Sequence, residues 1–363
     1  MKKILMVCEA FGGGVFSYVS QLCNDMCDHF EVYLAYSTRK QTPNNFKVFL
    51  DSRVNLIEVK SFSKISIPNF FNYRQVIREL RAIEQEINPD IIHLHSSLAG
   101  AFGRIAFKNR EKSVIYTPHG YAHVLMGTGV KCKAYFFAEK ILGRKSEAIT
   151  LTCCKSEDDE AKKLTNRTAY IETGININDL SENLKNVKPR GSSKFTVYTL
   201  GRVCKQKQPE LFNEIASLVP EARFVWIGGG ELENQLTSPN VEITGWKSRK
   251  EALGMAMSAD AFILCSLGEA IAMSLLENMY IRKLILVSNV MGNKSVINDG
   301  ENGYVCSSPS EYAEKIKLAM NEFPYQLVDN AYNDVISIYN TEKMKQKYIS
   351  FYNRVLEEME DIK

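Results

Sequence analysis

The sequence predicts an α/β protein with two doubly wound domains. Short apolar, β-branched runs alternate with longer amphipathic segments along the whole chain, a pattern that favours parallel sheets covered by helices on both faces. The chain has 363 residues, which is more than one hydrophobic core usually fills. The alternation stops at a polar stretch that contains Pro and Gly and then begins again. We therefore expect one domain on each side of that stretch.

The first half of the chain contains six expected strands, separated in most cases by helical patterns. They are residues 4–8, 30–37, 54–59, 91–95, 113–119 and 148–154. The second half contains five more. They are residues 195–200, 222–227, 241–245, 260–266 and 283–289.

The restart of the pattern sets the expected domain boundaries. The N-terminal domain is expected at residues 1–182, the linker at 183–194 and the C-terminal domain at 195–331. A final helical segment, about residues 332–363, follows the second sheet. We expect this segment to cross back to the first domain.

Composition argues against several classes of protein. The formal net charge of +3 is too small to indicate nucleic-acid binding. No run approaches the roughly 18 apolar residues that span a bilayer, and the N-terminal stretch reaches its glycines too early for a signal peptide. We therefore expect a cytoplasmic protein. The nine cysteines are interpreted as reduced core residues, and no metal site is expected, because no second Cys or His pair completes the spacing of Cys23 and Cys27.

The first expected strand ends in a glycine-rich loop that opens a helix. Glycines permit close approach of a backbone to a ligand, and the amides of a helix N-terminus attract an anion. A dinucleotide fingerprint would need a glycine at the position of Ser17 and an acid at the end of the second strand. We favour a phosphate or sugar loop at Gly13 and Gly14, with a dinucleotide site and a plain tight turn as alternatives.

Three histidines lie on first-domain strands or at their ends. His119 follows the strand at 113–119 within "TPHGY", where it can hydrogen-bond a ligand or transfer a proton. A buried histidine satisfied by the backbone is the alternative. His93 and His95 point to the same face of one strand and are interpreted as packing residues.

Charged residues follow two second-domain strands. Arg202 and Lys207 come after the strand at 195–200; a guanidinium fork and an ammonium point charge suit a diphosphate. A solvated basic loop is the alternative, and Lys205 fits it better than its neighbours.

Glu269 follows the strand at 260–266, and Glu277 lies in the next helix, where an apolar context makes a surface charge unexpected. With the nearby amides they can hold hydroxyls and a phosphate; those amides belong to Ala270, Ile271, Ala272 and Met273.

Taken together, these motifs resemble a family-4 glycosyltransferase of the GT-B fold, in which two Rossmann-like domains face a central cleft. The resemblance spans nearly the whole chain. It includes the glycine-rich loop, "PHG", the Arg202 to Lys207 loop, "FVWIGGGE", "VEITGW", Glu269 with seven residues before Glu277, and "DGENGYV". It implies transfer of a hexose from a nucleotide diphosphate sugar, a UDP-sugar above all, with retention of configuration and without a required metal or other cofactor.

The resemblance also implies residue roles. Arg202 and Lys207 match the pair that binds the donor diphosphate and stabilises the leaving charge, Glu269 matches the residue that contacts the donor sugar, and Glu277 matches the partner of the ribose hydroxyls. His119 matches the histidine near the transferred sugar, and Gly13 or Gly14 matches the loop that closes over the phosphates. The backbone around Gly245 and Trp246 matches the part that contacts the base.

Two positions depart from the family pattern. The residues after Glu269 are commonly Gly and an aromatic residue or Pro, and here they are Ala270 to Met273; the residue after Lys207 is commonly Gly and here is Gln208. Neither change removes a charge, so activity is still expected. A nucleotide-sugar epimerase of the same fold and a non-catalytic sugar-binding subunit are the alternatives.

Two first-domain segments, residues 60–81 and 131–145, combine basic and apolar residues. Such helices can lie on anionic lipid; the alternative is an ordinary amphipathic helix packed on its sheet. Members of the resembled family frequently act on polyprenyl-diphosphate-linked sugars of bacterial capsule, O-antigen or exopolysaccharide assembly. We expect such a glycan or lipid-linked acceptor, a peripheral location on the inner face of the cell membrane, and no nucleic-acid partner.

Overall fold

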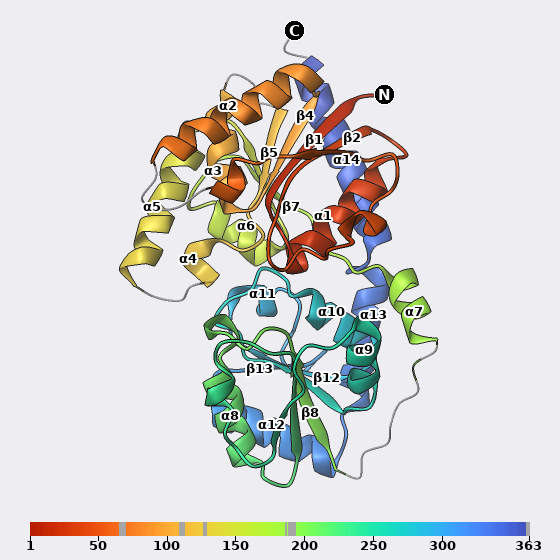
Figure 1. Cartoon of the computed structure of the whole chain (residues 1–363). Coiled ribbons are helices and arrows are strands. Elements are labelled where there is room, and N and C mark those ends of the chain that lie inside the picture. The colour runs from red at the N-terminus through yellow and green to blue at the C-terminus, as the bar shows by residue number, and fades with distance from the viewer. Residues whose placement is uncertain (65–69, 109–112, 126–128, 186, 188–193, 361–363) are drawn as a thin grey trace. The chain divides into compact units, whose positions relative to one another are not determined.

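The computed structural model describes residues 1–64, 70–108, 113–125, 129–185, 187 and 194–360 (Figure 1). The chain folds into two compact units. The first contains Met1–His123, Thr128–Glu172 and Met344–Lys363, and the second contains Val124–Gly127 and Thr173–Lys343. Each unit is built around one sheet in which every pair of neighbouring strands is parallel.

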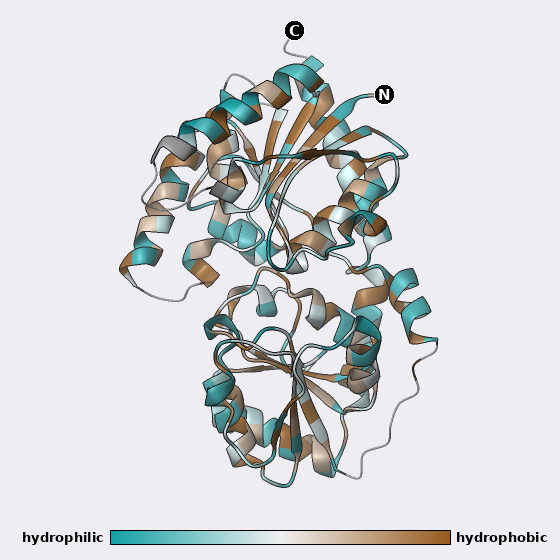
Figure 2. Ribbon diagram, viewed as in Figure 1, coloured by the Kyte–Doolittle hydropathy of each residue, from teal (hydrophilic) through white to brown (hydrophobic). Residues whose placement is uncertain are grey.

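The first unit has a seven-stranded sheet in the order β3-β2-β1-β4-β5-β6-β7. Its strands are largely hydrophobic (Figure 2), because helices cover both faces of a parallel sheet. The strands are β1 (Lys3–Phe11), β2 (Glu31–Thr38), β3 (Asn55–Glu58), β4 (Ile91–His95), β5 (Val114–Thr117), β6 (Ile149–Thr152) and β7 (Thr168–Tyr170). The helices are α1 (Gly13–Met26), α2 (Phe70–Ile87), α3 (Ser97–Ala106), α5 (Val130–Lys145), α6 (Lys155–Ala161) and α14 (Thr341–Glu360), with α4 (Ala122–Leu125) at the unit boundary and 3-10 turns η1 (Phe46–Phe49) and η2 (Phe62–Lys64).

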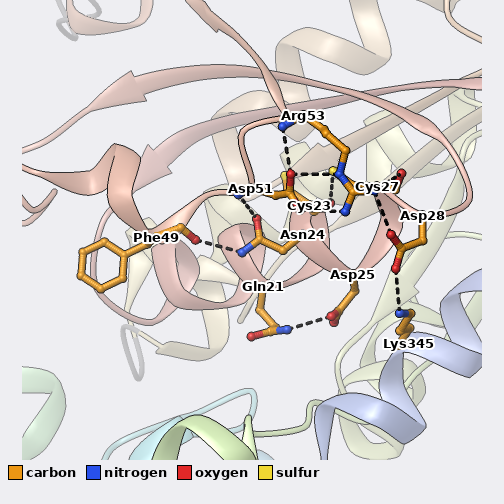
Figure 3. A network of polar contacts seen from close by, with 10 residues as sticks. All are labelled: Gln21, Cys23, Asn24, Asp25, Cys27, Asp28, Phe49, Asp51, Arg53 and Lys345. Atoms are coloured by element: carbon orange, nitrogen blue, oxygen red, sulfur yellow. Dashed lines mark hydrogen bonds and ion pairs between the residues drawn. The ribbon is translucent and has the colours of Figure 1, made fainter.

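The C-terminal helix α14 returns to the first unit, as expected from the sequence. Its Tyr348 hydroxyl lies 2.6 Å from the Tyr18 hydroxyl of α1. Lys345 extends this attachment, since its Nζ lies 3.6 Å from Oδ2 of Asp28 at the end of α1 (Figure 3). Asp28 is also paired with Arg53, at 2.8 Å, so α14 joins a polar network that fixes the end of α1.

The second unit has a six-stranded sheet in the order β10-β9-β8-β11-β12-β13. The strands are β8 (Thr196–Leu200), β9 (Arg223–Ile227), β10 (Val241–Ile243), β11 (Ala261–Leu264), β12 (Leu284–Ser288) and β13 (Tyr304–Cys306). The helices are α7 (Ile177–Leu184), α8 (Pro209–Leu218), α9 (Arg249–Met257), α10 (Met273–Tyr280), α11 (Met291–Lys294), α12 (Pro309–Asn321) and α13 (Tyr325–Ser337), with 3-10 turns η4 (Lys205–Lys207) and η5 (Glu233–Gln235).

Both faces of the second sheet are buried. On β11, Phe262 and Leu264 belong to one apolar core, and Ala261 and Ile263 belong to the other. Alternate residues of a strand point to opposite faces, so helices must cover both sides. The predicted doubly wound α/β class is confirmed.

The unit boundaries differ from those expected. Ile175 and Leu180 are buried in a core of the second unit, so the chain passes into that unit after Glu172. Ala331 and Val335 of α13 are buried in the same core, and only the residues from Met344 onward group with the first unit. Most of the expected linker, residues 186 and 188–193, lies outside the described residues.

Every expected strand run contains a strand. The two additional strands, β7 and β13, are three residues long and form the edges of their sheets. A run so short carries little periodicity; β10 is equally short and was predicted only as part of the longer run 241–245.

The cysteines lie mainly in the cores. Eight of the nine are buried, and none forms a disulfide within the described residues. Burial raises the pKa of the Cys27 thiol to about 11, and Cys27 Sγ donates to the Cys23 carbonyl at 3.2 Å (Figure 3). In the described part of the chain, no three or more His, Cys, Asp or Glu side chains form a group suited to a metal ion.

The helices differ in length and in apolar character. None of those in the described ranges combines the length and apolar character needed to cross a membrane.

Candidate active site

Each sheet has one point where the strand order reverses. This point lies between β1 and β4 in the first unit and between β8 and β11 in the second. Open parallel sheets bind ligands outside the carboxyl ends of their strands at such a point. The basic loop follows β8 and the Glu269 loop follows β11, so two of the predicted motifs meet at the switch point of one unit.

Lys207 and Glu269 form an ion pair at this point. Lys207 Nζ lies 2.6 Å from Glu269 Oε1, and their side chains are 18% and 10% exposed. Two charges so shielded from water are tolerated only when they are paired and hydrogen-bonded. The pair therefore holds the Lys207 ammonium in one position at the carboxyl end of the sheet.

Two glutamines, which the sequence analysis did not identify as site residues, connect the same loops. Gln206 Nε2 donates to the Gly268 carbonyl at 3.0 Å, and the Gln206 carbonyl accepts from the Leu267 amide at 2.8 Å. The side-chain amide of Gln208 donates to the Cys265 carbonyl. These bonds fix the loop that carries Lys207 against the loop that carries Glu269.

The departure from glycine at Gln208 has a backbone explanation. Gln208 has φ 49° and ψ 64°, the left-handed conformation that glycine adopts without strain. In the resembled family the residue at this position is commonly glycine, which suits the left-handed conformation. Here the hydrogen bond to Cys265 compensates part of the strain.

Arg202 lies in the same loop but is exposed. Among the described residues no ion pair or hydrogen bond of its side chain is found, so none links it to Glu269. The backbone beside it is fixed, since Trp226 Nε1 donates to the Gly201 carbonyl at 3.0 Å. A Cβ atom at Gly228 would lie 2.1 Å from that carbonyl oxygen, so this glycine is required by the close approach of two loops.

Glu277 has a protein partner in α9. Its Oε1 lies 3.0 Å from an Arg249 nitrogen, and its side chain is 17% exposed. Arg249 explains how a carboxylate is held in an apolar helix, and the sequence analysis did not identify it. In the structure each of the two carboxylates is paired with its own cation, Glu269 with Lys207 and Glu277 with Arg249. The expectation that Glu269 and Glu277 bind one ligand together stays a prediction.

Helix α10 begins just after the Glu269 loop, at Met273. The residue before it, Ala272, has an extended backbone and makes no side-chain cap hydrogen bond, so the first-turn amides are oriented as in an anion site. Ala270 and Ile271 complete this loop. A Cβ atom at Gly292 would lie 1.9 Å from the Ala270 carbonyl oxygen, so the loop rests directly on the backbone at Gly292.

The predicted base contact lies after β10. Gly245 has φ 66° with open space around its Cβ position, and Trp246 is 70% exposed. An isolated bridge pairs Gly245 with Gly228, which places this turn beside the loop after β9. An exposed indole next to an open backbone is suited to a planar ligand.

In the first unit, Gly13 and Gly14 follow β1 at its switch point. Gly13 has φ 55°, and neither glycine has an atom within 4 Å of a Cβ position. The structure therefore leaves room for a ligand at the start of α1, as a phosphate loop requires.

His119 forms hydrogen bonds with side chains rather than with the backbone. Its Nε2 lies 3.0 Å from Nδ1 of His95, and its Nδ1 lies 3.6 Å from Sγ of Cys153. Its ring packs edge-on against Tyr18, with centroids 4.7 Å apart. His93, behind His95 in the same strand, bonds to the Thr117 hydroxyl at 2.8 Å.

These three histidines are neutral at physiological pH. Burial lowers the pKa of His119 to about 3 and lowers the pKa values of His93 and His95 well below the usual range. A neutral imidazole donates one hydrogen bond and accepts one. The neutral His119 ring is not suited to neutralise a phosphate, and both of its nitrogens are used within the protein, so contact with a ligand hydroxyl requires the exchange of one of these bonds.

Glu157 holds the "PHG" turn, and the sequence analysis did not identify it. The residue is fully buried; one carboxylate oxygen accepts from the Gly120 amide at 2.7 Å and the other from the Cys153 amide at 2.8 Å. Burial raises its pKa. His119 and Gly120 both have positive φ, 54° and 94°, so Glu157 stabilises a turn with an uncommon backbone.

Two family models match this chain, and between them they include nearly all of it. Residues 12–179 match the model described as Glycosyltransferase Family 4. Residues 181–334 match the model described as Glycosyl transferases group 1.

Curated relatives and solved structures give consistent matches. The chain is 31% identical over 289 residues to the UDP-Gal:alpha-D-GlcNAc-diphosphoundecaprenol alpha-1,3-galactosyltransferase of Escherichia coli, with 71% of this chain and 72% of that protein covered. It is 25% identical over 288 residues to the O-antigen biosynthesis glycosyltransferase WbnH of Escherichia coli, with 74% and 82% covered. Its fold is similar to sucrose-phosphate synthase from Thermosynechococcus elongatus, with TM-score 0.79, 16% identity and coverage of 98% and 99%. It is also similar to Anabaena HepE in complex with UDP-glucose, with TM-score 0.76, 16% identity and coverage of 98% and 100%.

The left-handed backbone at Gln208 gives a testable order of stabilities. Gln208→Ala and Gln208→Gly both lose the hydrogen bond to Cys265, but only alanine places a Cβ in the left-handed region. We expect Q208A to be less stable than Q208G by about 1 kcal/mol in urea unfolding. The same pair at Glu214, an exposed position inside α8, should give the reverse order, since alanine favours a helix. A common order at both positions would contradict the argument.

The neutral histidines predict a loss of stability in acid. In the unfolded chain a histidine has a pKa of about 6.5, and in the folded protein those of His93, His95 and His119 are lower. The unfolded state therefore binds more protons as the pH falls below about 6.5, at a cost of up to about 1.4 kcal/mol per pH unit for each histidine. The raised pKa of Glu157 acts in the opposite sense and offsets part of this loss at lower pH.

We expect the free energy of unfolding in urea to fall between pH 7.5 and pH 5.5. His119→Asn keeps a side chain that tolerates positive φ and should make this fall less steep by about 1 kcal/mol per pH unit. His29→Asn changes an exposed histidine and serves as the control. Equal slopes for H119N, H29N and the unmodified protein would show that burial of His119 is not the cause.

Proposed function

This chain belongs to glycosyltransferase family 4 and has the GT-B fold, and from that premise we propose that it transfers a hexose from a UDP-sugar to a polyprenyl-diphosphate-linked glycan. The proposal includes retention of anomeric configuration and a place in bacterial capsule, O-antigen or exopolysaccharide assembly. Support for the donor and the acceptor comes from the name of the Escherichia coli galactosyltransferase, which uses UDP-Gal and a diphosphoundecaprenol-linked sugar. The O-antigen relative supports the same acceptor class.

The Lys207–Glu269 ion pair at the second switch point carries the proposal. The acceptor hydroxyl oxygen forms the new bond to the sugar C1 atom as the bond between C1 and the phosphate oxygen breaks. The electron pair of the broken bond stays on the phosphate oxygen, so negative charge grows on the departing diphosphate, which takes up the hydroxyl proton. Fixed cations and helix amides stabilise such a charge most effectively when they are already in place. Lys207 supplies the fixed ammonium, Arg202 supplies a mobile guanidinium, and the first turn of α10 supplies amides.

The other predicted residues are assigned to the parts of the donor that do not react. Glu269 and the loop after it bind sugar hydroxyls, and Glu277 binds the ribose while Arg249 holds its carboxylate. The turn at Gly245 and Trp246 meets the base. His119, in its neutral form, hydrogen-bonds the transferred sugar by exchanging the 3.6 Å contact of its Nδ1 with Cys153 Sγ.

A thermal-shift panel tests the nucleotide. We compare UDP, GDP and ADP with their sugars, and we expect UDP and one UDP-sugar to give the largest rise in Tm. A ligand at about 100 times its Kd stabilises the folded state by about 2.7 kcal/mol. A larger rise with GDP or ADP, or no rise with any nucleotide, would overturn the proposed donor.

Lys207 and Lys205 provide a matched test of catalysis, because both lie in η4 and, among the ion pairs of the described residues, only Lys207 is paired with a carboxylate. We expect Lys207→Ala to lower kcat by about 10² to 10³, the usual cost of losing one preorganised donor. Lys205→Ala removes an equal charge from an exposed side chain and should change kcat by no more than about twofold. The measurement is transfer of labelled sugar to a diphosphate-linked acceptor. Similar losses in both variants would show that general loop charge, and not the position of Lys207, is responsible.

A further inference from the structure

Helix α5 contacts the rest of the first unit through one side only. Gly143 is its one buried residue. The inward contact is fixed by Glu139, whose carboxylate lies 2.7 Å from an Arg104 nitrogen of α3 and accepts from the Tyr116 hydroxyl of β5 at 3.0 Å. The helix is thus firmly attached, while its opposite side has no apolar cover from the described residues.

That opposite side carries an apolar stripe. Val130, Phe137 and Ile141 are 85%, 59% and 54% exposed, and Ala134 between them is exposed as well. Val130, Ala134, Phe137 and Ile141 follow one another at spacings of four, three and four residues. At about 100° per residue these positions share one face of a helix, and Gly143 lies on the opposite face. Figure 2 shows hydrophobic and hydrophilic segments along α5.

Cations border the stripe on both sides. The helix contains five basic residues and one acid. By helical rotation, one group of cations lies on each side of the apolar positions. They are Lys133, Lys140 and Arg144 on one side and Lys131 and Lys145 on the other. The single acid, Glu139, is occupied by Arg104, so the outward surface of α5 is apolar and positive.

Two kinds of occupant would cover such a stripe. A second copy of α5 would fit the apolar spacing, which is that of a coiled-coil seam, but it would bring two rows of like charge together. An anionic lipid surface matches both features, since apolar side chains enter the acyl boundary while Lys and Arg contact the headgroups. Charge therefore favours the membrane.

We propose that the outward face of α5 is a docking surface for an anionic lipid bilayer. The stripe lies in the interfacial plane, and the flanking cations lie at the depth of the phosphates. The role of this surface in catalysis rests on the proposed function, because a membrane-bound enzyme encounters a lipid-linked acceptor at high local concentration. The binding itself requires no sugar and no nucleotide.

The other basic segment, residues 60–81, gives weaker support. Residues 65–69 lie outside the described residues. Within α2, Val76 and Leu80 are buried, and Arg81 Nε donates to the Ala106 carbonyl at 3.0 Å. This segment is used at least in part for packing.

Vesicle flotation with the full chain tests the proposal. The probes are vesicles of phosphatidylcholine alone and vesicles in which about a third of the lipid is phosphatidylglycerol, at low salt. One variant removes apolar contacts, Phe137→Ser with Ile141→Ser. A second removes charge, Lys133→Gln with Arg144→Gln. The matched controls change exposed residues of the second unit, Leu318→Ser with Ile336→Ser and Lys250→Gln with Lys317→Gln.

We expect the unmodified chain to bind the anionic vesicles and to bind the neutral vesicles far less. The charge variant should bind about thirty-fold more weakly, which corresponds to about 1 kcal/mol per cation at 1.36 kcal/mol per decade. The apolar variant should lose at least about tenfold, and both controls should bind as the unmodified chain does. Circular dichroism and Tm show that the variants fold.

Three results would overturn the proposal. They are absence of binding to anionic vesicles, equal binding by the α5 variants and the controls, and a concentration-dependent dimer that Phe137→Ser with Ile141→Ser abolishes. Transfer to a short-chain, water-soluble acceptor separates the docking surface from the proposed function. Variants that lose vesicle binding but keep this transfer support the docking surface. An unmodified chain that binds vesicles but transfers no sugar would refute the proposed function and leave the docking surface standing.

Discussion

The reversal of strand order between β8 and β11 is the constraint on which the candidate site depends. The chain leaves β8 toward β9 and leaves β11 toward β12, so the two connections diverge and leave the carboxyl ends of the two strands uncovered. The first residues of both loops must then face each other. This is why Lys207 and Glu269, which are 62 positions apart in the sequence, meet at 2.6 Å.

In the first unit the corresponding constraint is a buried polar core. The ring centroids of His93 and His95 lie 4.0 Å apart with the ring planes tilted by 35°, and His93 Nδ1 lies 2.7 Å from the hydroxyl of Tyr352, which comes from α14. Ionised groups in such a place would require several kcal/mol of desolvation, so the histidines are neutral. Two hydroxyls satisfy His93 and His119 bonds to His95 Nδ1, whereas His95 Nε2 has no hydrogen-bond partner among the described residues. The return of α14 is therefore part of what orients the turn that carries His119.

The sequence was sufficient for the features that depend on local pattern. Runs such as 91–95 and 260–266 are rich in apolar residues because both faces of their sheets are covered, and they contain β4 and β11 as predicted. Gly13 and Lys207 follow strand ends, and a strand end can be found from the sequence alone. The edge strands β7 and β13 were not predicted, because their three residues contain no clear period; β10 is equally short but belongs to a longer β-rich run, 241–245.

The features that were missed depend on residues far apart in the chain. Gln208 is a departure from a family pattern in the sequence, and its left-handed φ appears only in three dimensions. Glu157 follows a strand with other acids around it, and nothing in "KSEDDE" distinguishes the one carboxylate that caps Gly120. Arg249 and Glu277 are partners through the packing of α9 and α10, which no spacing predicts. Identification of strand ends gives the place of the candidate site, whereas the hydrogen bonds that fix its loops require the folded chain.

The pairing of Lys207 with Glu269 also determines how the proposed site divides its work. A carboxylate at 2.6 Å cancels much of the ammonium field at long range, so Lys207 attracts an approaching diphosphate weakly. Arg202 is exposed and has no ion pair among the described residues, so its field reaches further into solution and its long side chain can follow the ligand. Under the proposed function, Arg202 captures the donor, and Lys207 acts when charge moves onto the phosphate at close range. Because Glu269 holds the Lys207 ammonium in place, this cation needs little reorganisation when charge moves onto the phosphate. Electrostatic stabilisation of a leaving group is largest when the stabilising charge is already in position.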